Sequence, residues 1–137
     1  MMVGRIVALV VQNGKSYFET LRRALQRENI NVVRAADAQE AKAFIRSAEP
    51  PEIVFTDTEF PDGTWEEILR TSQEARRPLQ VIVVSPYVDM NLYMEAMQQG
   101  AFDFIVPPVS DSDLAYIVEG AAWKALKDRN LPALSVA

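Results

Sequence analysis

The chain has 137 residues, of which 49% are hydrophobic, and a formal net charge of −5; this size and composition indicate one globular domain with its own core. It contains no cysteine and no histidine, which excludes disulfides, thiolate or imidazole metal sites and histidine-based acid–base catalysis. The acidic balance argues against direct binding to nucleic acid or to an anionic membrane.

The sequence carries no pattern that is typical of membrane insertion or secretion. No apolar run approaches the ~20 residues of a transmembrane helix, and Arg5 interrupts the first apolar run, which ends at Val11. We therefore expect a cytoplasmic protein. We also expect the domain to occupy residues 1–128, with 129–137 as a C-terminal tail or the start of a linker.

Strand and helix patterns alternate five times along the chain. Short runs rich in β-branched and other apolar residues predict buried strands at 5–11, 31–35, 53–57, 80–84 and 102–106. Helical patterns follow these strands, within 17–25, 41–48, 65–72, 89–100 and 114–125. This rhythm predicts an α/β fold with one parallel sheet and helices on both faces.

Short polar residues mark several helix starts. Asp37 is a good N-cap, and Glu40 three residues later completes a capping-box pattern. Asp89 precedes the fourth helix, and Ser110 or Asp111 precedes the fifth. Each has a side-chain oxygen that can accept from the free backbone N–H groups of a first turn.

Asp57 lies at the end of the third predicted strand, directly before a turn at 61–63 and the helix that begins near Trp65. In an open α/β sheet, ligands and chemistry gather at the carboxyl ends of the strands. From its position alone, Asp57 is explained as well by a turn residue or a helix cap as by a functional role.

Residues 14–16, Gly-Lys-Ser, follow a strand and open a helix, as the end of a phosphate-binding P-loop does. The full pattern needs a glycine at position 9, where this chain has Leu9. Because the tight backbone cradle for phosphates is missing, the pattern argues against nucleotide binding.

Several short sequence segments occur in the order and at the spacing that are typical of a known protein family. They are Val10-Val11 ending the first strand, Asp57 ending the third, Phe-Pro-Asp-Gly at 60–63, Ser85 after the fourth strand, and EAMQQGAFDF at 95–104. Residues 5–127 thus resemble a response-regulator receiver domain of bacterial two-component signalling. The resemblance implies a single flavodoxin-like (βα)5 domain with strand order 2-1-3-4-5.

The same resemblance assigns roles to individual residues. Asp57 aligns with the phosphoacceptor aspartate, Ser85 with the hydroxyl residue that follows the phosphoryl group, and Phe104 with the aromatic switch residue. It also implies a cis bond between Pro107 and Pro108, an isomer that costs X–Pro bonds only about 0.5–1 kcal/mol.

The chain departs from the receiver pattern at the positions that neutralise charge. Two acidic residues that help hold Mg²⁺ in the family are replaced by Gln12 and Asn13, and neutral amides compete poorly with water for this ion. The lysine that neutralises the phosphoryl oxygens is replaced by Pro107, which has neither a charge nor an N–H donor. Glu59, two residues after Asp57, is a candidate to reach the metal, and Lys15 is a candidate to approach the phosphate, although a solvated surface charge is the more ordinary explanation of each.

The leading interpretation is a degenerate receiver, or pseudo-receiver: a protein–protein interaction module, not an enzyme, with weak or no phosphorylation of Asp57. We expect no cofactor, and at most weak Mg²⁺ binding at Asp57 and Glu59. A working receiver that accepts a phosphoryl group from a histidine kinase is the first alternative, and an unrelated small α/β enzyme is the second. Expected partners are a histidine kinase, an output domain or a second copy of the chain, without direct contact to nucleic acid or a membrane.

Candidates for a protein interface lie on the fourth helix. Met94 and Met97 are expected to fill gaps in the core. Leu92 and Tyr93 lie beside them in the sequence, so we expect these two to face outward.

The fifth helix carries two more interface candidates. Tyr116 and Trp123 are seven residues apart and share one stripe, offset from the core face of the helix. Large aromatic residues outside a core are enriched at interfaces, although they also roof the margin of a core. Because the resemblance implies pairing through the fourth helix, fifth strand and fifth helix, these candidates fit a homodimer formed there.

Overall fold

A five-stranded parallel sheet forms the centre of the protein. The computed structural model describes residues 6–12 and 17–136, with side chains up to residue 130. The strands are β1 (Val7–Val11), β2 (Asn31–Ala35), β3 (Ile53–Asp57), β6 (Gln80–Val84) and β7 (Asp103–Ile105). Their order is β2-β1-β3-β6-β7, and all neighbouring pairs are parallel. This confirms the predicted flavodoxin-like order, with β6 and β7 as the fourth and fifth strands.

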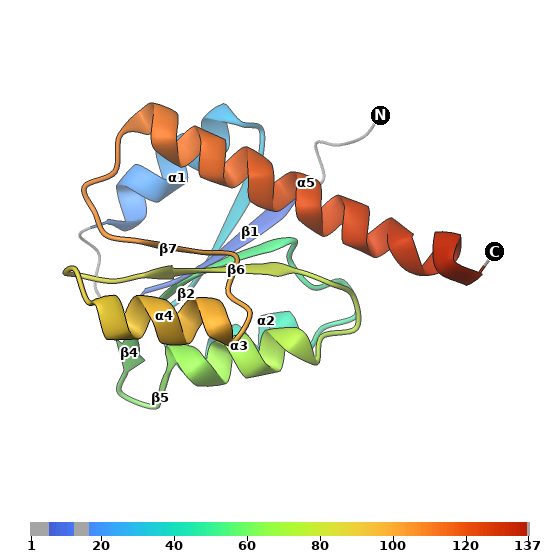
Figure 1. Cartoon of the computed structure of the whole chain (residues 1–137), viewed down its shortest axis with the longest axis horizontal. Coiled ribbons are helices and arrows are strands. Elements are labelled where there is room, and N and C mark those ends of the chain that lie inside the picture. The colour runs from blue at the N-terminus through green and yellow to red at the C-terminus, as the bar shows by residue number, and fades with distance from the viewer. Residues whose placement is uncertain (1–5, 13–16, 137) are drawn as a thin grey trace.

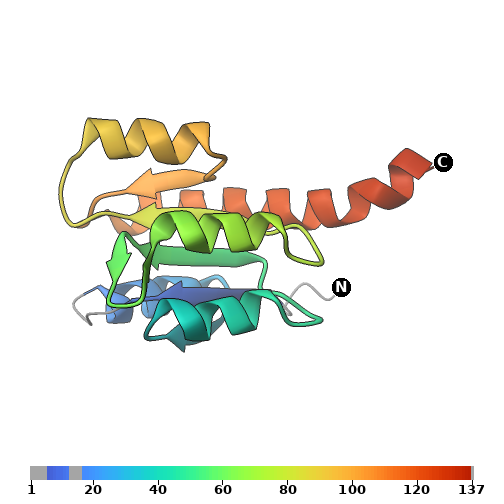
Figure 2. The same ribbon diagram turned by 90° about the horizontal axis from the view of Figure 1, so that it is seen from below.

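Helices cover both faces of the sheet (Figure 1). One face carries α1 (Phe18–Arg27) and α5 (Asp111–Val136), and the other carries α2 (Ala38–Ile45), α3 (Trp65–Gln73) and α4 (Met90–Gln98). Figure 2, seen from below, shows α2, α3 and α4 in front of the strands, which lie side by side in this view. Successive strand side chains point to opposite faces, so Val10 is buried in the α1–α5 layer and Leu9 in the α2–α4 layer. Among the described residues, no helix is both long and apolar enough to cross a membrane.

The predicted caps of α2 and α4 are confirmed. Asp37 Oδ1 accepts a hydrogen bond from the backbone N–H of Glu40 at 2.8 Å, and Glu40 Oε1 accepts one from the backbone N–H of Ala36 at 2.9 Å. Asp89 Oδ1 accepts one from the backbone N–H of Leu92 at 3.0 Å. Each carboxylate therefore satisfies an amide that has no partner within its helix.

Ser110, rather than Asp111, caps α5. Its Oγ accepts a hydrogen bond from the backbone N–H of Asp113 at 3.1 Å. The Asp111 carboxylate instead pairs with Arg27 at the end of α1, with 3.2 Å between Oδ2 and Nη1. The structure thus settles the choice that the sequence left open in favour of Ser110.

A short antiparallel hairpin, β4 (Glu59–Phe60) with β5 (Gly63–Thr64), follows β3, where the sequence predicted only a turn. Its tip holds Asp62 against the first turn of α2. There Oδ1 accepts from the backbone N–H of Ala38 and Oδ2 from that of Gln39, both at 3.0 Å. These bonds favour the charged carboxylate and hold the pKa of Asp62 below its ordinary value. Asp62 therefore ties the hairpin to α2.

The rotation of α4 differs from the expectation. Ala96 is fully buried, which brings Leu92 and Met97 half-buried against the α2–α4 layer. Met94 is 52% exposed, so the expectation that it fills the core is wrong, and Leu92 packs inward rather than outward. Tyr93 is exposed, as predicted. The small side chain of Ala96 forms the contact with the sheet, and this contact sets which residues of α4 face outward.

The residues expected to form a tail continue α5 as far as the structure describes them (Figure 1). The Arg129 side chain is only 4% exposed and pairs with Glu52 at 3.0 Å. Its guanidinium also donates to the carbonyl oxygens of Pro50, Pro51 and Pro78. Arg129 thus packs against the segments that lead into β3 and β6, one residue beyond the expected boundary at 128.

Candidate functional site

A pocket of about 640 Å³ opens at the carboxyl ends of β1, β3 and β6. Gln12 follows β1, Asp57 ends β3 and Ser85 follows β6, and all three line this pocket together with Pro107 from the loop after β7. The sheet register brings them together, because Asp57 lies opposite Val84, the residue before Ser85. Of the positions that the resemblance assigned to the site, these four line one pocket.

The Ser85 hydroxyl is held by its own loop. Ser85 is fully buried, and its hydroxyl donates to the carbonyl oxygen of Tyr87 at 2.6 Å. Its backbone N–H donates to the carbonyl oxygen of Ile105 at 2.9 Å, which ties the end of β6 to β7. The hydroxyl thus lies in the same pocket as Asp57, with its proton directed at the loop backbone.

Two buried oxygens of this pocket have no hydrogen-bond partner within the described part of the chain: Oε1 of Gln12 and the hydroxyl oxygen of Tyr17. Gln12 is 4% exposed. Burial raises the pKa of Tyr17, and the negative charge of Asp111 raises it further, so the phenol is neutral at physiological pH. A buried polar atom left unpaired costs about 1–3 kcal/mol. No pattern in the sequence pointed to either unpaired oxygen.

The bond between Pro107 and Pro108 is cis, as predicted. Both proline rings line the pocket. At position 107 the site therefore has an apolar ring, where the resemblance leads one to expect a lysine ammonium group.

Phe104, at the aromatic switch position, lies half-buried against the α2–α4 layer. The ring of Tyr93 on α4 meets it edge-on, with 5.7 Å between ring centroids and an angle of 88° between planes. This edge-to-face geometry is favourable for an aromatic pair. The two rings link β7 to α4 at the edge of the sheet.

Glu59 and Lys15 were the two candidates to replace the charged groups that the receiver pattern has and this chain lacks. Glu59, on β4, lines the pocket. Lys15 and Asn13 lie outside the described residues, as does the whole Gly-Lys-Ser stretch at 14–16. Within the described residues, no cluster of three or more acidic, histidine or cysteine side chains is arranged to hold a metal ion.

The sequence of this chain matches a family model described as the response regulator receiver domain over residues 8–119. The chain belongs to this family. Receiver domains form a signalling family rather than an enzyme family, so the alternative of an unrelated small enzyme is not supported.

Individual relatives agree with this assignment. The response regulator protein PilR of Pseudomonas aeruginosa is 27% identical over 119 residues, which cover 87% of this chain and 26% of PilR. A response regulator from Thermotoga maritima has a TM-score of 0.76 at 28% identity, and the match covers 87% of this chain and 98% of that one. The signal receiver domain of a putative LuxO repressor protein from Vibrio parahaemolyticus has a TM-score of 0.81 at 22% identity, over 97% and 98% of the two chains, and shows likeness of fold alone. This receiver thus spans only part of the length of a relative such as PilR.

Receiver domains typically bind Mg²⁺ at the phosphorylation site. Asp57 and Glu59 are the carboxylates among the described residues of the pocket, and Gln12 supplies a neutral amide at a position where the receiver pattern has an acid.

The predicted interface aromatics are exposed on either side of β7, the edge strand of the sheet. Tyr116 is 80% exposed and Trp123 is 65% exposed, both on α5, and Tyr93 is exposed on α4. The Lys127 ammonium group lies 4.9 Å from the centroid of the Trp123 ring, a cation–π contact.

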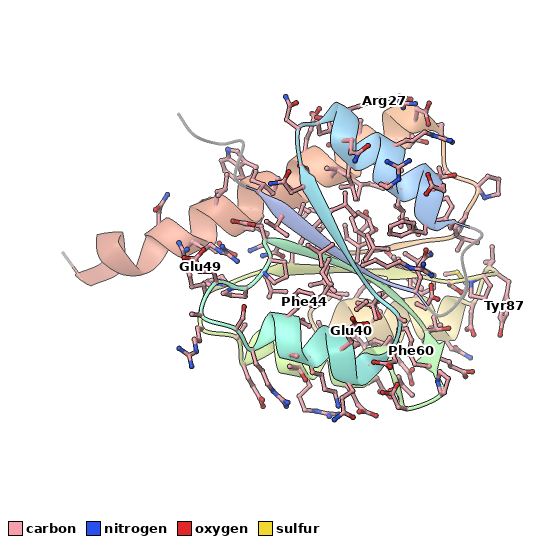
Figure 3. All side chains as sticks on the ribbon, turned by 180° about the vertical axis from the view of Figure 1, so that it is seen from behind. Arg27, Glu40, Phe44, Glu49, Phe60 and Tyr87 are labelled. Atoms are coloured by element: carbon pink, nitrogen blue, oxygen red, sulfur yellow. The ribbon has the colours of Figure 1, made fainter. Side chains whose placement is uncertain are left out.

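Sequence reasoning missed a second group of exposed apolar residues at the start of α4. Figure 3 shows Tyr87 of this group at the margin of the molecule. The available signal was the crowding of apolar residues around the N-cap Asp89, where polar residues are usual. We call the combined set the α4–α5 surface: Tyr87, Val88, Met90, Tyr93, Met94, Tyr116 and Trp123.

Proposed function

We propose that this receiver is a protein–protein interaction module in which Asp57 is phosphorylated weakly or not at all. The composition of the pocket carries the proposal: Gln12 and Pro107 stand beside Asp57 where receivers have an acid and a lysine. Phosphoryl transfer depends almost wholly on positioning and charge neutralisation. With neither neutralising group in place, the pocket stabilises a transferring phosphoryl group poorly.

The α4–α5 surface is the docking site in this proposal. Its aromatic and methionine side chains form the kind of surface that is enriched at protein interfaces. Partners of this kind are a histidine kinase, an output domain or a second copy of the chain. Because the surface is exposed in the structure as it stands, docking there does not depend on a phosphoryl group.

Intact mass after incubation with acetyl phosphate and Mg²⁺ tests the phosphorylation part of the proposal. We expect no gain of one phosphoryl group in the natural chain. The variant with Gln12→Asp, Asn13→Asp and Pro107→Lys should gain it, and adding Asp57→Asn should abolish that gain. Efficient modification of Asp57 in the natural chain would overturn the proposal.

Isothermal titration with Mg²⁺ tests the metal site directly. We expect no tight binding at millimolar concentration, and higher affinity after Gln12→Asp and Asn13→Asp restore two carboxylates. Tight binding by the natural chain would contradict this expectation.

A working phospho-receiver that accepts its phosphoryl group from a histidine kinase is the second candidate function. The observation in its favour is that Asp57 and Ser85 share one pocket at adjacent strand ends. The mass measurement above separates the two functions, because this second function requires modification of Asp57 without any substitution.

A further inference from the structure

We propose that a hollow on the exposed side of α5 binds an arginine side chain of a protein partner. The hollow has a volume of about 440 Å³ and lies between β7 and the middle of α5. Its lining residues are Phe102, Asp103, Tyr116, Ile117, Glu119 and Gly120. The inference rests on the proposed docking at the α4–α5 surface, to which Tyr116 belongs, and names the side chain that a partner places there.

The first step is the glycine that opens the hollow. Inside a helix, glycine is less favourable than any residue except proline, and Gly120 does not have the positive φ that would require it. A Cβ atom at this position would lie 3.4 Å from Cζ of the Phe102 ring. The fold therefore does not demand a glycine here, and the missing side chain leaves the edge of the Phe102 ring open to the hollow.

The second step is the apolar part of the wall. Phe102 and Ile117 are half-buried against the α1–α5 layer, and the ring of Tyr116 is exposed beside them. The hydrocarbon stem of an arginine covers such apolar surface while its charged head stays in a polar environment. The planar guanidinium group also stacks on aromatic rings, which a lysine ammonium group does less well.

The third step is charge. Asp103 on β7 and Glu119 on α5 bring two carboxylates to the hollow, and no lining residue is basic. Within the described part of the chain, neither carboxylate forms a salt bridge with a lysine or an arginine. Asp103 Oδ1 accepts a hydrogen bond from the backbone N–H of Phe104 at 2.7 Å, which leaves its charge unpaired. A guanidinium group has enough N–H donors to serve carboxylates from both elements.

A third carboxylate adds to this negative charge. Burial raises the pKa of Glu28 at the end of α1, and the neighbouring Glu119 carboxylate raises it further. The adjacent cation, Arg27, pairs instead with Asp111 at 3.2 Å. Like charges held this close oppose ionisation, and a cation bound beside Glu119 would relieve that opposition. The local potential therefore favours a basic side chain over a neutral or acidic one.

The position of the hollow favours a protein as the source of the guanidinium group. Gly120 lies four residues after Tyr116 and three before Trp123, so the three share one face of α5. Tyr116 and Trp123 are both exposed. A partner that covers these two aromatic rings also covers the hollow between them, and arginine is one of the residues enriched at protein interfaces.

Two-dimensional NMR titration at millimolar concentration tests the inference with three probes: Nα-acetyl-arginine amide, Nα-acetyl-citrulline amide and Nα-acetyl-lysine amide. We expect saturable shifts of the backbone amides of Asp103, Glu119 and Gly120 with the arginine probe. Citrulline has nearly the same shape without the charge and should bind about tenfold more weakly. Lysine should bind about threefold more weakly, because its ammonium group stacks poorly. Equal affinity for arginine and either other probe, or shifts that do not saturate, would overturn the inference.

Variants of the natural chain locate the site. Glu119→Gln and Asp103→Asn each remove one charge and should weaken binding of the arginine probe about 3- to 10-fold. Gly120→Leu places a side chain in the hollow and should abolish binding, while leucine remains a good helix former. Glu74→Gln is the matched control for lost charge, because Glu74 is exposed at the end of α3 on the other face of the sheet.

Thermal unfolding checks that each variant is folded. Glu119→Gln, at an exposed position, decides the question if another variant is not. Unchanged affinity in the folded variants of the hollow, or an equal loss in Glu74→Gln, would contradict the proposed site.

The two proposals fail in different experiments. Phosphorylation of the natural chain by acetyl phosphate would refute the proposed function, whatever the titration shows. Absence of saturable binding of the arginine probe, in a chain that also resists phosphorylation, would refute the arginine site and leave the interaction module in place.

Discussion

At the scale of single residues, the Gln12 side chain affects both the stability of this receiver and the composition of its pocket. Its side chain is almost fully buried, and its Oε1 has no partner in the described part of the chain. Groups that are needed for binding often reduce stability in the free protein. Gln12 is thus a position where an apolar side chain would suit the fold better, although it would remove an acceptor from the pocket.

We therefore expect Gln12→Leu to stabilise the chain by about 1 kcal/mol. The leucine side chain is of similar size to that of glutamine and has no unsatisfied buried oxygen. Urea unfolding should show a higher midpoint with an unchanged slope. Gln98→Leu is the control, since Gln98 is an exposed glutamine on α4 and its replacement should change stability by less than about 0.5 kcal/mol. A destabilised Gln12→Leu variant would show that the amide has a partner in solution.

At the scale of elements, two charged side chains join pieces that are distant in the sequence. Asp62 at the tip of the β4–β5 hairpin receives the first N–H groups of α2. Arg129 on α5 binds the segment before β3 and the residue Pro78 before β6. Both contacts occupy backbone groups that would otherwise lack partners at the ends of helices or strands.

Asp62→Ala should lower the melting temperature at neutral pH. Folding lowers the pKa of Asp62 through the N–H groups of Ala38 and Gln39, so its contribution is fully present above the ordinary aspartate pKa of about 3.9. It is lost as the pH falls through the lowered value. The difference in melting temperature between the natural chain and Asp62→Ala should therefore shrink below about pH 4. The control Glu49→Ala, which removes an exposed carboxylate, should show no such pH-dependent difference.

Arg129→Met should lower the free energy of unfolding by about 3 kcal/mol, because it leaves the partly buried Glu52 carboxylate without its cation. Lys124→Met is the matched control on the same helix. Lys124 pairs with Asp128 at the surface, and loss of an exposed pair should cost less than about 1 kcal/mol. Chemical unfolding of both variants measures the difference, and equal effects would show that Arg129 has no special structural role.

At the scale of the whole molecule, the residues of the α4–α5 surface are exposed on α4, on the loop before it and on α5. The pocket lies at the carboxyl ends of the strands, and Pro86 of its wall is adjacent in sequence to Tyr87 of this surface. The two features are therefore joined by the loop between β6 and α4, although each is tested by a separate experiment.

Trp123→Ala and Tyr93→Ala should leave the fold intact but weaken association through the α4–α5 surface about tenfold or more, because exposed aromatics in such surfaces dominate binding. Sedimentation velocity over a range of concentrations measures self-association. Phe44→Ala is the control, since Phe44 is an exposed aromatic on α2 outside this surface (Figure 3). A natural chain that is monomeric at high concentration would exclude self-association, and the partner would then be a different protein.

The sequence by itself determined the elements, their class and the position of Asp57. Hydrophobic periodicity is a local property, so the five strands and the helices between them were predicted without a structure. The caps at Asp37 and Asp89 were predictable for the same reason, because each bonds an amide three residues away. Family resemblance supplied the strand order and the meeting of Gln12, Ser85 and Asp57 at one edge.

Only the tertiary structure decided the features that depend on distant neighbours. Asp62 bonds a residue 24 positions away, and Arg129 bonds one 79 positions away, separations at which no local pattern carries information. Met94 faces outward because Ala96 makes the contact with the sheet, and Gln12 Oε1 lacks a partner because of what surrounds it in the pocket. Packing and hydrogen-bond satisfaction belong to the assembled chain, since they depend on which side chains the fold brings within a few ångströms of each other.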